Sequence, residues 1–409
     1  MFRLFVVCTP GLEMLTAQEL KESGLNLGPF PATDSGPDLA CREEEAGGIE
    51  FQGSLTDLYR ANLCLRTASR ILVRLGDFQA TVFPELRRKA SHLPWEHYLT
   101  VGRPVTLRVT CHKSRLYHQG AVAERVALAI GDRLGQIPEV QKPGGNLETD
   151  LPQLIIVRLL DNRCTVSVDS SGALLHRRGY RLATAKAPLR ETLAVAILLA
   201  SGWDTRHPLL DPLCGSGTIP IEAALLARAI APGHARRFAF MDWPNFDEGK
   251  WRDVLSEGPN DREPRAPKIL ASDRDAGALR MAMENAERAG VADAIEFSRR
   301  ALSAVEPPAE RGWVVTNPPY GVRVGEGKDL RNLYARLGQV LRTKCPGWRF
   351  AILGRRGALL ESIGLPFDGE ISFRNGGLRV TLATGIFVRP GERPTAPGAS
   401  RVPHKGNPL

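Results

Sequence analysis

The tetrapeptide Asn317-Pro318-Pro319-Tyr320 combines residue types that can hold a planar amine beside a methyl donor. An exocyclic amine on a nucleobase attacks poorly, because its lone pair is delocalised into the ring. The Asn317 side-chain oxygen and the Pro318 carbonyl can accept the two amine hydrogens, while the Tyr320 ring stacks on the base. The motif therefore predicts methyl transfer to nitrogen without a metal. The alternative is a Pro-Pro turn that only ends the apolar strand expected at 313–316.

A second motif, LLDPLCGSGT at residues 209–218, leads from an apolar strand end through a glycine turn into a helical pattern at 219–230. In open α/β sheets such turns lie at the carboxyl ends of strands, where glycines let the backbone approach a ligand. The spacing differs from both the nicotinamide fingerprint and the phosphate loop. We expect a ligand with an adenosine and an amino-acid moiety, unless the turn is purely structural. The candidate contacts are Asp211, Cys214, Gly215, Gly217 and Thr218; Cys214 is expected to pack rather than to act as a nucleophile.

The next strand, expected at 268–272, ends at Asp273, and a helix follows at 276–289. Asp275 is placed to cap that helix, whereas Asp273 at the strand end can accept both ribose hydroxyls of a nucleoside. An exposed Asp273 without a ligand is the alternative. Between the two motifs, residues 232–267 are rich in Pro, Gly and charge and are interpreted as an insertion.

Taken together with HRRGYR at 176–181 and APLRETLA at 187–194, these motifs resemble the THUMP-containing RNA guanine-N2 methyltransferases. The similarity is greatest to the N-terminal methyltransferase half of the RlmL-type 23S rRNA enzymes. It extends over about residues 2–388, including 66–71 and 114–118. The resemblance implies a ferredoxin-like part at 1–60, to which segments near 80–110 can belong, and a THUMP domain at 61–172. It further implies a class I, Rossmann-like methyltransferase domain with a seven-stranded sheet at 173–389.

The resemblance also implies S-adenosylmethionine as cofactor and structured RNA as substrate, with 23S rRNA favoured over tRNA. By the same resemblance, Asp211, Gly215 and Gly217 bind the methionine end of the cofactor and Asp273 binds its ribose. Asn317, which also borders the cofactor, would hold the target guanine together with Pro318 and Tyr320.

One segment departs from the family pattern. After the strand expected near 295–297, the family places an Asp that contacts the adenine amine, but this chain has Ser298-Arg299-Arg300-Ala301. Losing one hydrogen bond costs about 0.5–1.5 kcal/mol, roughly tenfold in affinity, which does not abolish binding. Two alternatives stay open: an RNA-binding or ribosome assembly factor with an inert methyltransferase domain, and an enzyme that acts on DNA adenine or on a protein glutamine.

Charge is distributed unevenly along the 409 residues. Residues 1–60 contain 4 basic and 10 acidic side chains, whereas residues 61–190 contain 20 basic and 10 acidic ones. A basic middle part would attract RNA phosphates, although a solvated surface is the simpler alternative. The candidate RNA contacts are Lys113 and Arg115, which flank a turn, and Arg177, Arg178 and Arg181, which lie at the junction of the two halves and could instead pair across it.

Composition excludes several other classes of protein. Seven scattered cysteines without a C-x-x-C pair argue against a disulfide framework and a zinc site. The longest apolar run, about 193–200, is too short to span a bilayer, and the amino terminus reads as a strand rather than a signal peptide, so a cytoplasmic location is expected.

The pattern of elements predicts α+β modules rather than one doubly wound sheet, and after residue 180 the alternating strands and helices of a parallel α/β sheet. We expect strands at 4–8, 71–75, 104–110, 154–160 and 164–169, helices at 12–23, 55–68, 83–92 and 121–134, an exposed loop at 31–48, an edge strand at 385–388 and a disordered tail at 390–409.

Overall fold

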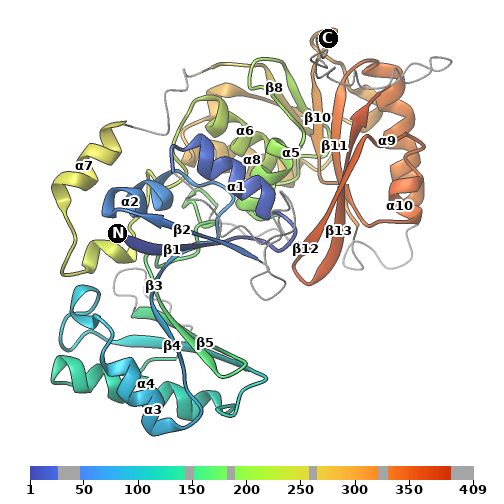
Figure 1. The fold of residues 1–409 in the computed structure, drawn as a ribbon. Helices are drawn as coiled ribbons and strands as arrows, with labels where there is room; N and C mark the ends of the chain where they lie inside the picture. The colour runs from blue at the N-terminus through green and yellow to red at the C-terminus, as the bar shows by residue number, and fades with distance from the viewer. Residues whose placement is uncertain (26–46, 143–151, 182–188, 258–264, 321–329, 388–409) are drawn as a thin grey trace, which may run out of the picture.

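The computed structural model describes residues 1–25, 47–142, 152–181, 189–257, 265–320 and 330–387. Within these ranges the chain forms two sheets, one in each half, with helices packed against them (Figure 1). The tail at 390–409 and most of the loop at 31–48 lie outside the described residues, so those two expectations stay predictions.

The N-terminal half contains a six-stranded sheet in the order β2-β1-β3-β6-β5-β4, in which only β4 and β5 pair in parallel. Its strands are β1 (Phe2–Val7), β2 (Gly48–Gly53), β3 (Arg70–Gln79), β4 (Val105–His112), β5 (Gln153–Leu160) and β6 (Arg163–Asp169). Its helices are α1 (Glu13–Glu22), α2 (Leu55–Cys64), α3 (Phe83–Ser91) and α4 (Gln119–Leu134). All of these elements except β2 have a predicted counterpart whose ends differ by a few residues; β2 was not predicted.

The long strand β3 joins the two parts of this sheet. It pairs with β1 through Arg70–Val73 and continues along β6 as far as Gln79, with a register shift between Arg74 and Gly76. Figure 1 shows this strand running from the N-terminal strands down to the layer that α3 and α4 cover. Helix α2 crosses residue 60, where the sequence suggested a boundary between ferredoxin-like and THUMP parts, so that division remains a proposal.

The C-terminal half is built on a seven-stranded sheet in the order β12-β13-β11-β10-β7-β8-β9. Its strands are β7 (Leu209–Asp211), β8 (Ile269–Asp273), β9 (Ile295–Arg299), β10 (Trp313–Thr316), β11 (Arg349–Gly354), β12 (Gly369–Asn375) and β13 (Leu378–Ile386). The first five are parallel, and β13 is antiparallel to both of its neighbours, β11 and β12. Its helices are α5 (Glu191–Ala200), α6 (Thr218–Ala227), α7 (Glu248–Glu257), α8 (Ala276–Arg288), α9 (Leu330–Lys344) and α10 (Ala358–Glu361). The predicted class I, Rossmann-like architecture is confirmed.

The expectation of an edge strand at 385–388 is wrong. Residues 385 and 386 end β13, which lies between β11 and β12 and is paired on both sides. Strand β12 was not among the predicted strands, although its residues 370–374 alternate between polar and apolar, and β12 rather than β13 forms that edge of the sheet.

The insertion at 232–267 joins the two halves through aromatic side chains. Phe238, Phe240 and Trp243 belong to the N-terminal core, and Tyr59 of α2 stacks on Phe240 with ring centroids 4.5 Å apart. The backbone N–H of Asp247 donates to the Tyr59 hydroxyl over 2.9 Å. Helix α7 therefore lies beside α2, far from α7's own sheet (Figure 1). Burying such aromatic surface is strongly favourable, so the insertion fixes the N-terminal half to the C-terminal half.

Candidate active site

Three parallel strands end side by side and bring the predicted site residues together. Strand β7 lies between β8 and β10, and the chain order reverses at β7, because β8 and β9 lie on one side of it and β10 and β11 on the other. Ligands of open α/β sheets bind at such a reversal, outside the carboxyl ends of the strands. Asp211, Asp273 and Asn317 lie at or just after these three ends.

Asp211 connects the two strands at the reversal. Its Oδ1 accepts a hydrogen bond of 2.7 Å from the Thr316 hydroxyl and one of 3.2 Å from the backbone N–H of Leu213. The side chain is only 1% exposed. Burial raises the pKa of Asp211 to about 7, and the nearby charge of Asp273 acts in the same direction. The carboxyl group therefore holds the end of β10, and with it Asn317, against the start of the glycine turn.

The two glycines of the turn have different surroundings. Gly217 has a φ of +82°, and a Cβ there would lie 2.9 Å from the Cβ of Ala282 in α8, so α6 can approach α8 only with glycine at this position. Gly215 has a φ of +53°, but a Cβ there would meet no heavy atom within 4 Å. At Gly217 the turn therefore packs directly against α8. At Gly215 no protein atom covers the turn, so a ligand could contact the backbone there.

Asp273 is oriented by backbone amides. Its Oδ2 accepts from the N–H of Gly215 over 3.0 Å and its Oδ1 accepts from the N–H of Asp275 over 2.9 Å. Each carboxylate oxygen keeps a further lone pair, so the group can still accept two ribose hydroxyls. Asp275 caps α8 by accepting from the N–H groups of Gly277 and Ala278, as predicted.

Asn317 presents an acceptor that nothing in the described part of the chain uses. Its Oδ1 is buried yet has no hydrogen-bond partner there, which is rare for a buried polar atom. Pro318 is buried beside it, and the half-buried Tyr320 ring packs against the core of the C-terminal half. An unused acceptor next to an aromatic ring is the arrangement that the amine-binding prediction requires.

Sequence reasoning missed Asn375, at the end of β12. Its Nδ2 donates to the Tyr320 hydroxyl over 2.7 Å, so the β12–β13 hairpin holds the ring through its hydroxyl group. Burial raises the pKa of Tyr320, which keeps its hydroxyl protonated at neutral pH. Because 55 residues separate the two side chains, no local pattern could have indicated this contact.

The remaining candidate residues of the glycine turn, Cys214 and Thr218, are both buried. Cys214 is buried, and burial raises the pKa of its thiol, in agreement with packing rather than nucleophilic chemistry. Thr218 is buried as well, and its hydroxyl accepts a hydrogen bond of 2.6 Å from Arg181. Its role as a cofactor contact stays a prediction. After β9, the N–H of Arg300 donates to the carbonyl of Asp273, and the segment offers no acidic side chain for an adenine amine.

The candidate RNA contacts separate into two groups. Arg178 donates to the carbonyls of Leu175 and Arg66, both over 2.7 Å, and lies 3.7 Å from Glu222. Arg181 donates to Leu189 and Thr218. These two guanidinium groups thus pair within the junction, which is the alternative that the sequence left open.

The other three candidates, Lys113, Arg115 and Arg177, are exposed. The loop that contains Lys113 and Arg115 is fixed by a hydrogen bond of 2.8 Å from the N–H of Arg115 to the side chain of Asn162, in the turn between β5 and β6. These three side chains remain available to a partner.

Neither a metal cluster nor a membrane span is found where the chain is described. No group of three or more His, Cys, Asp or Glu side chains there could hold a metal ion. No helix in the same ranges is long and apolar enough to cross a membrane.

The residues fit S-adenosylmethionine: the backbone is open at Gly215, Asp273 retains acceptor capacity for a ribose, and Asn317 has an unused acceptor beside the turn. Fold and site together define a class I methyltransferase that depends on this cofactor. The family model described as "RMKL-like, methyltransferase domain" matches residues 178–395, and the one described as "RlmL ferredoxin-like domain" matches residues 33–72. The chain belongs to the RMKL-like methyltransferase family.

Individual relatives agree with this assignment. The protein slr0064 of Synechocystis sp., named as an RNA methyltransferase, is 34% identical over 381 residues, which cover 92% of this chain and 95% of the relative. The ribosomal RNA large subunit methyltransferase K/L of Syntrophotalea carbinolica is 36% identical over 393 residues, which cover 93% of this chain and 53% of the relative. The chain thus spans about half the length of the K/L enzymes. The crystal structure of SMU.472, described as a methyltransferase complexed with SAH, superposes with a TM-score of 0.80 at 28% identity and covers 96% of this chain and 99% of that one.

Proposed function

We propose that this chain methylates the exocyclic N2 amine of a guanosine in structured RNA, with 23S rRNA favoured over tRNA. The observation that carries the proposal is the buried, unpartnered Asn317 Oδ1 beside the Tyr320 ring, next to the glycine turn. RNA as substrate is supported by the names of the relatives and by the basic residues 61–190. The choice of guanine N2 rests on the family resemblance, because two acceptors would suit any exocyclic amine.

In this mechanism the cofactor supplies an electrophilic methyl group. The Asn317 Oδ1 and the Pro318 carbonyl accept the two amine hydrogens and turn the nitrogen lone pair toward the turn at Gly215. The Tyr320 ring stacks on the base and fixes its plane. The acceptors also stabilise the positive charge that develops on the nitrogen, so catalysis consists mainly of positioning and electrostatics. The excess proton then passes to solvent.

The N-terminal half would hold the rest of the RNA. We assign a THUMP RNA-binding module to residues 61–172, after a ferredoxin-like part at 1–60 and before a methyltransferase domain at 173–389. Lys113, Arg115 and Arg177 are three exposed basic residues that could contact phosphates. The cytoplasm, where ribosomal RNA is modified, is the location that fits this substrate.

The test is a methylation assay with labelled cofactor on 23S rRNA, tRNA, DNA and protein, followed by nuclease digestion and mass spectrometry of the nucleosides. We expect N2-methylguanosine in RNA. Replacing Asn317 with Ala should lower turnover on the order of 100-fold, since one group that stabilises transition-state charge is lost, with little change in RNA or SAH affinity. Methyladenine in DNA, or methylated protein alone, would overturn the proposal.

The inert RNA-binding alternative is favoured by one observation, the absence of an acidic side chain at 298–301. Calorimetry separates the two functions. Binding of SAH with a dissociation constant at or below the high micromolar range supports the enzyme, whereas no heat at millimolar SAH would support an assembly factor.

A further inference from the structure

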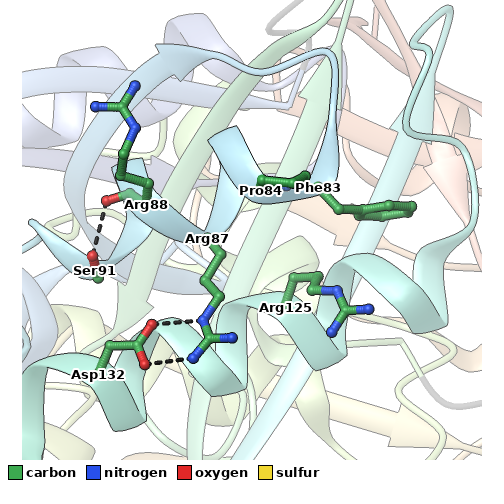
Figure 2. A pocket seen from close by; sticks show the side chains of 7 residues that line it. All are labelled: Phe83, Pro84, Arg87, Arg88, Ser91, Arg125 and Asp132. Atoms are coloured by element: carbon green, nitrogen blue, oxygen red, sulfur yellow. Dashed lines mark hydrogen bonds and ion pairs between the residues drawn. The ribbon is translucent and has the colours of Figure 1, made fainter.

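A hollow in the N-terminal half lies between α3 and α4, away from the strand ends of the active site (Figures 1 and 2). Its volume is about 530 Å³, within the range that small-molecule sites occupy. It is lined mainly by Phe83, Pro84, Arg87, Arg88, Arg125 and Asp132. Nothing in the proposed methyl transfer uses these side chains.

The three arginines of this α3–α4 groove differ in how their charge is balanced. Arg87 is neutralised by two hydrogen bonds of 2.6 Å to the carboxylate of Asp132, as Figure 2 shows. Among the described residues, Arg125 forms an ion pair with Glu124 at 3.4 Å, an exposed pair that contributes little. Arg88 is exposed and forms no ion pair with any described residue. The groove therefore has two cations that an anionic partner could engage, at opposite ends: in Figure 2 the Arg88 guanidinium extends away from Arg125 and from the Phe83 ring.

Phe83 adds an aromatic surface to this charge. Its ring is half-buried, and the Arg125 guanidinium lies 6.0 Å from the ring centroid. In Figure 2 the ring and the guanidinium border the same hollow. Aromatic rings flanked by arginines are the surfaces on which unpaired nucleobases stack in single-stranded nucleic acid sites.

A basic loop precedes α4, the helix that contributes Arg125 to the groove. Arg125 is six residues after the first residue of α4, roughly 9 Å along the helix axis. The loop contributes the exposed Lys113 and Arg115, together with Tyr117, which is 77% exposed. Basic and aromatic candidate contacts for RNA are thus present both in the groove and in the loop that precedes α4.

We propose that the α3–α4 groove binds a single-stranded segment of the RNA, with Arg88 and Arg125 on its phosphates and one base stacked on Phe83. This inference rests on the proposed function, because it assumes an RNA substrate. A duplex suits the groove less well, because its base faces are covered by their neighbours. An acidic peptide would satisfy the charges but would leave the ring unused.

The experiment uses the full chain and a labelled single-stranded RNA oligonucleotide, with affinity measured by fluorescence anisotropy over a salt series. The double variant Arg88→Ala/Arg125→Ala should bind at least about tenfold more weakly, and its log–log salt slope should shrink by roughly 1.4, about 0.7 for each lost phosphate contact. Phe83→Leu should weaken binding about fivefold or more with an unchanged salt slope.

The matched control is Arg133→Ala, which removes an α4 arginine that is paired with Glu96 and lies outside the groove lining. It should stay within about twofold of the wild type, as expected for an exposed ion pair. Wild-type SAH affinity and melting temperature in every variant will show that the fold is intact.

The outcomes distinguish the groove from the proposed function. If the wild type methylates RNA but the groove variants bind the oligonucleotide as it does, the groove proposal fails and the function stands. If the wild type methylates no RNA, the proposed function fails whatever the groove binds. The groove assignment would also be overturned if the variants lost as much affinity for duplex RNA as for the single strand. It would likewise fail if a polyglutamate peptide bound as tightly as RNA and lost affinity in the same variants.

Discussion

Thr316 donates a hydrogen bond of 2.7 Å to Asp211 across the carboxyl ends of β10 and β7. Asn317 follows Thr316 directly, and the glycine turn follows Asp211, so this contact fixes the amine-binding motif relative to the cofactor turn. A methyl transfer depends on alignment of donor and acceptor to within fractions of an ångström. The Asp211–Thr316 pair is thus the structural basis of the proposed chemistry.

The raised pKa of Asp211 predicts a specific pH dependence of stability. Between its ordinary pKa of 3.8 and the native value of about 7, the native protein keeps a proton that the unfolded chain has lost. Stability therefore falls as pH rises through this window, and the full penalty applies above it. Asp211→Asn avoids the ionisation and keeps an oxygen for Thr316, so its stability gain over the wild type should grow from about pH 4 to pH 7, to a few kcal/mol at most.

Urea unfolding across this pH range measures the difference between variant and wild type. Asp275→Asn is the control, because helix-cap hydrogen bonds lower the pKa of Asp275 and an asparagine caps equally well. Its difference from the wild type should be constant above about pH 5. A pH-independent difference for Asp211→Asn would show that the buried carboxyl group is ionised throughout.

The two glycines of the turn should respond differently to alanine. Gly217→Ala places a Cβ 2.9 Å from Ala282 with φ at +82°, so we expect a loss of stability of roughly 2–4 kcal/mol from overpacking and backbone strain. Gly215→Ala meets no protein atom within 4 Å and should cost only about 1–2 kcal/mol from its positive φ. Its methyl group would instead occupy the space of the ligand, so SAH affinity should fall at least about tenfold, or 1.4 kcal/mol.

Thermal unfolding and calorimetric titration with SAH test the pair. If Gly215→Ala bound SAH as tightly as the wild type, the cofactor would not contact the backbone at Gly215. Equal melting temperatures for the two variants would contradict the packing argument for Gly217.

How much of this site the sequence predicts depends on how far apart in the sequence the interacting residues lie. Asp211, Asp273 and Asn317 each follow an apolar strand, a local pattern, and parallel strands bring their carboxyl ends to one edge, so their proximity could be predicted. Arg178 and Arg181 could not be assigned, because an arginine that pairs inside a junction has the same local sequence as one that binds phosphate.

Contacts made by the insertion and by the β12–β13 hairpin were beyond prediction for a related reason. Both depend on which distant surface a segment packs against. The aromatic spacing of 238–251 shows no helical or strand period that would point to α2, and nothing near Asn375 indicates Tyr320 as its partner.

The insertion should contribute strongly to stability. Phe240 is fully buried, stacks on Tyr59 and lies 5.2 Å from the Phe238 ring. Phe240→Ala would leave a cavity between the two halves, and we expect a loss of about 3–5 kcal/mol. Leu255→Ala, at a position of α7 that is 43% exposed, should change stability by less than about 0.5 kcal/mol. Chemical denaturation measures both, and similar values would mean that the insertion contributes little to joining the halves.

The hydrogen bond from Asn375 to Tyr320 should matter for turnover rather than for cofactor binding. Tyr320→Phe keeps the ring but removes the hydroxyl, and Asn375→Leu leaves that hydroxyl half-buried and unpaired. Each change should lower kcat/KM for RNA about threefold to tenfold, since a net hydrogen bond contributes about 0.5–1.5 kcal/mol. If Tyr320→Phe and Asn375→Leu act through the same contact, the double variant should lose no more kcat/KM than the more damaging single variant.

Tyr320→Ala calibrates this prediction, because it removes the stacking surface as well. Stacking of a base on an aromatic ring contributes about 1–3 kcal/mol, so this variant should lose more kcat/KM than Tyr320→Phe, while SAH affinity stays unchanged in all four variants. Additive losses in the double variant would mean that Asn375 affects the reaction by a route other than the Tyr320 ring. A fall in SAH affinity would instead place the hairpin contact on the cofactor side of the pocket, because a residue that only orients the target base leaves cofactor binding unaffected.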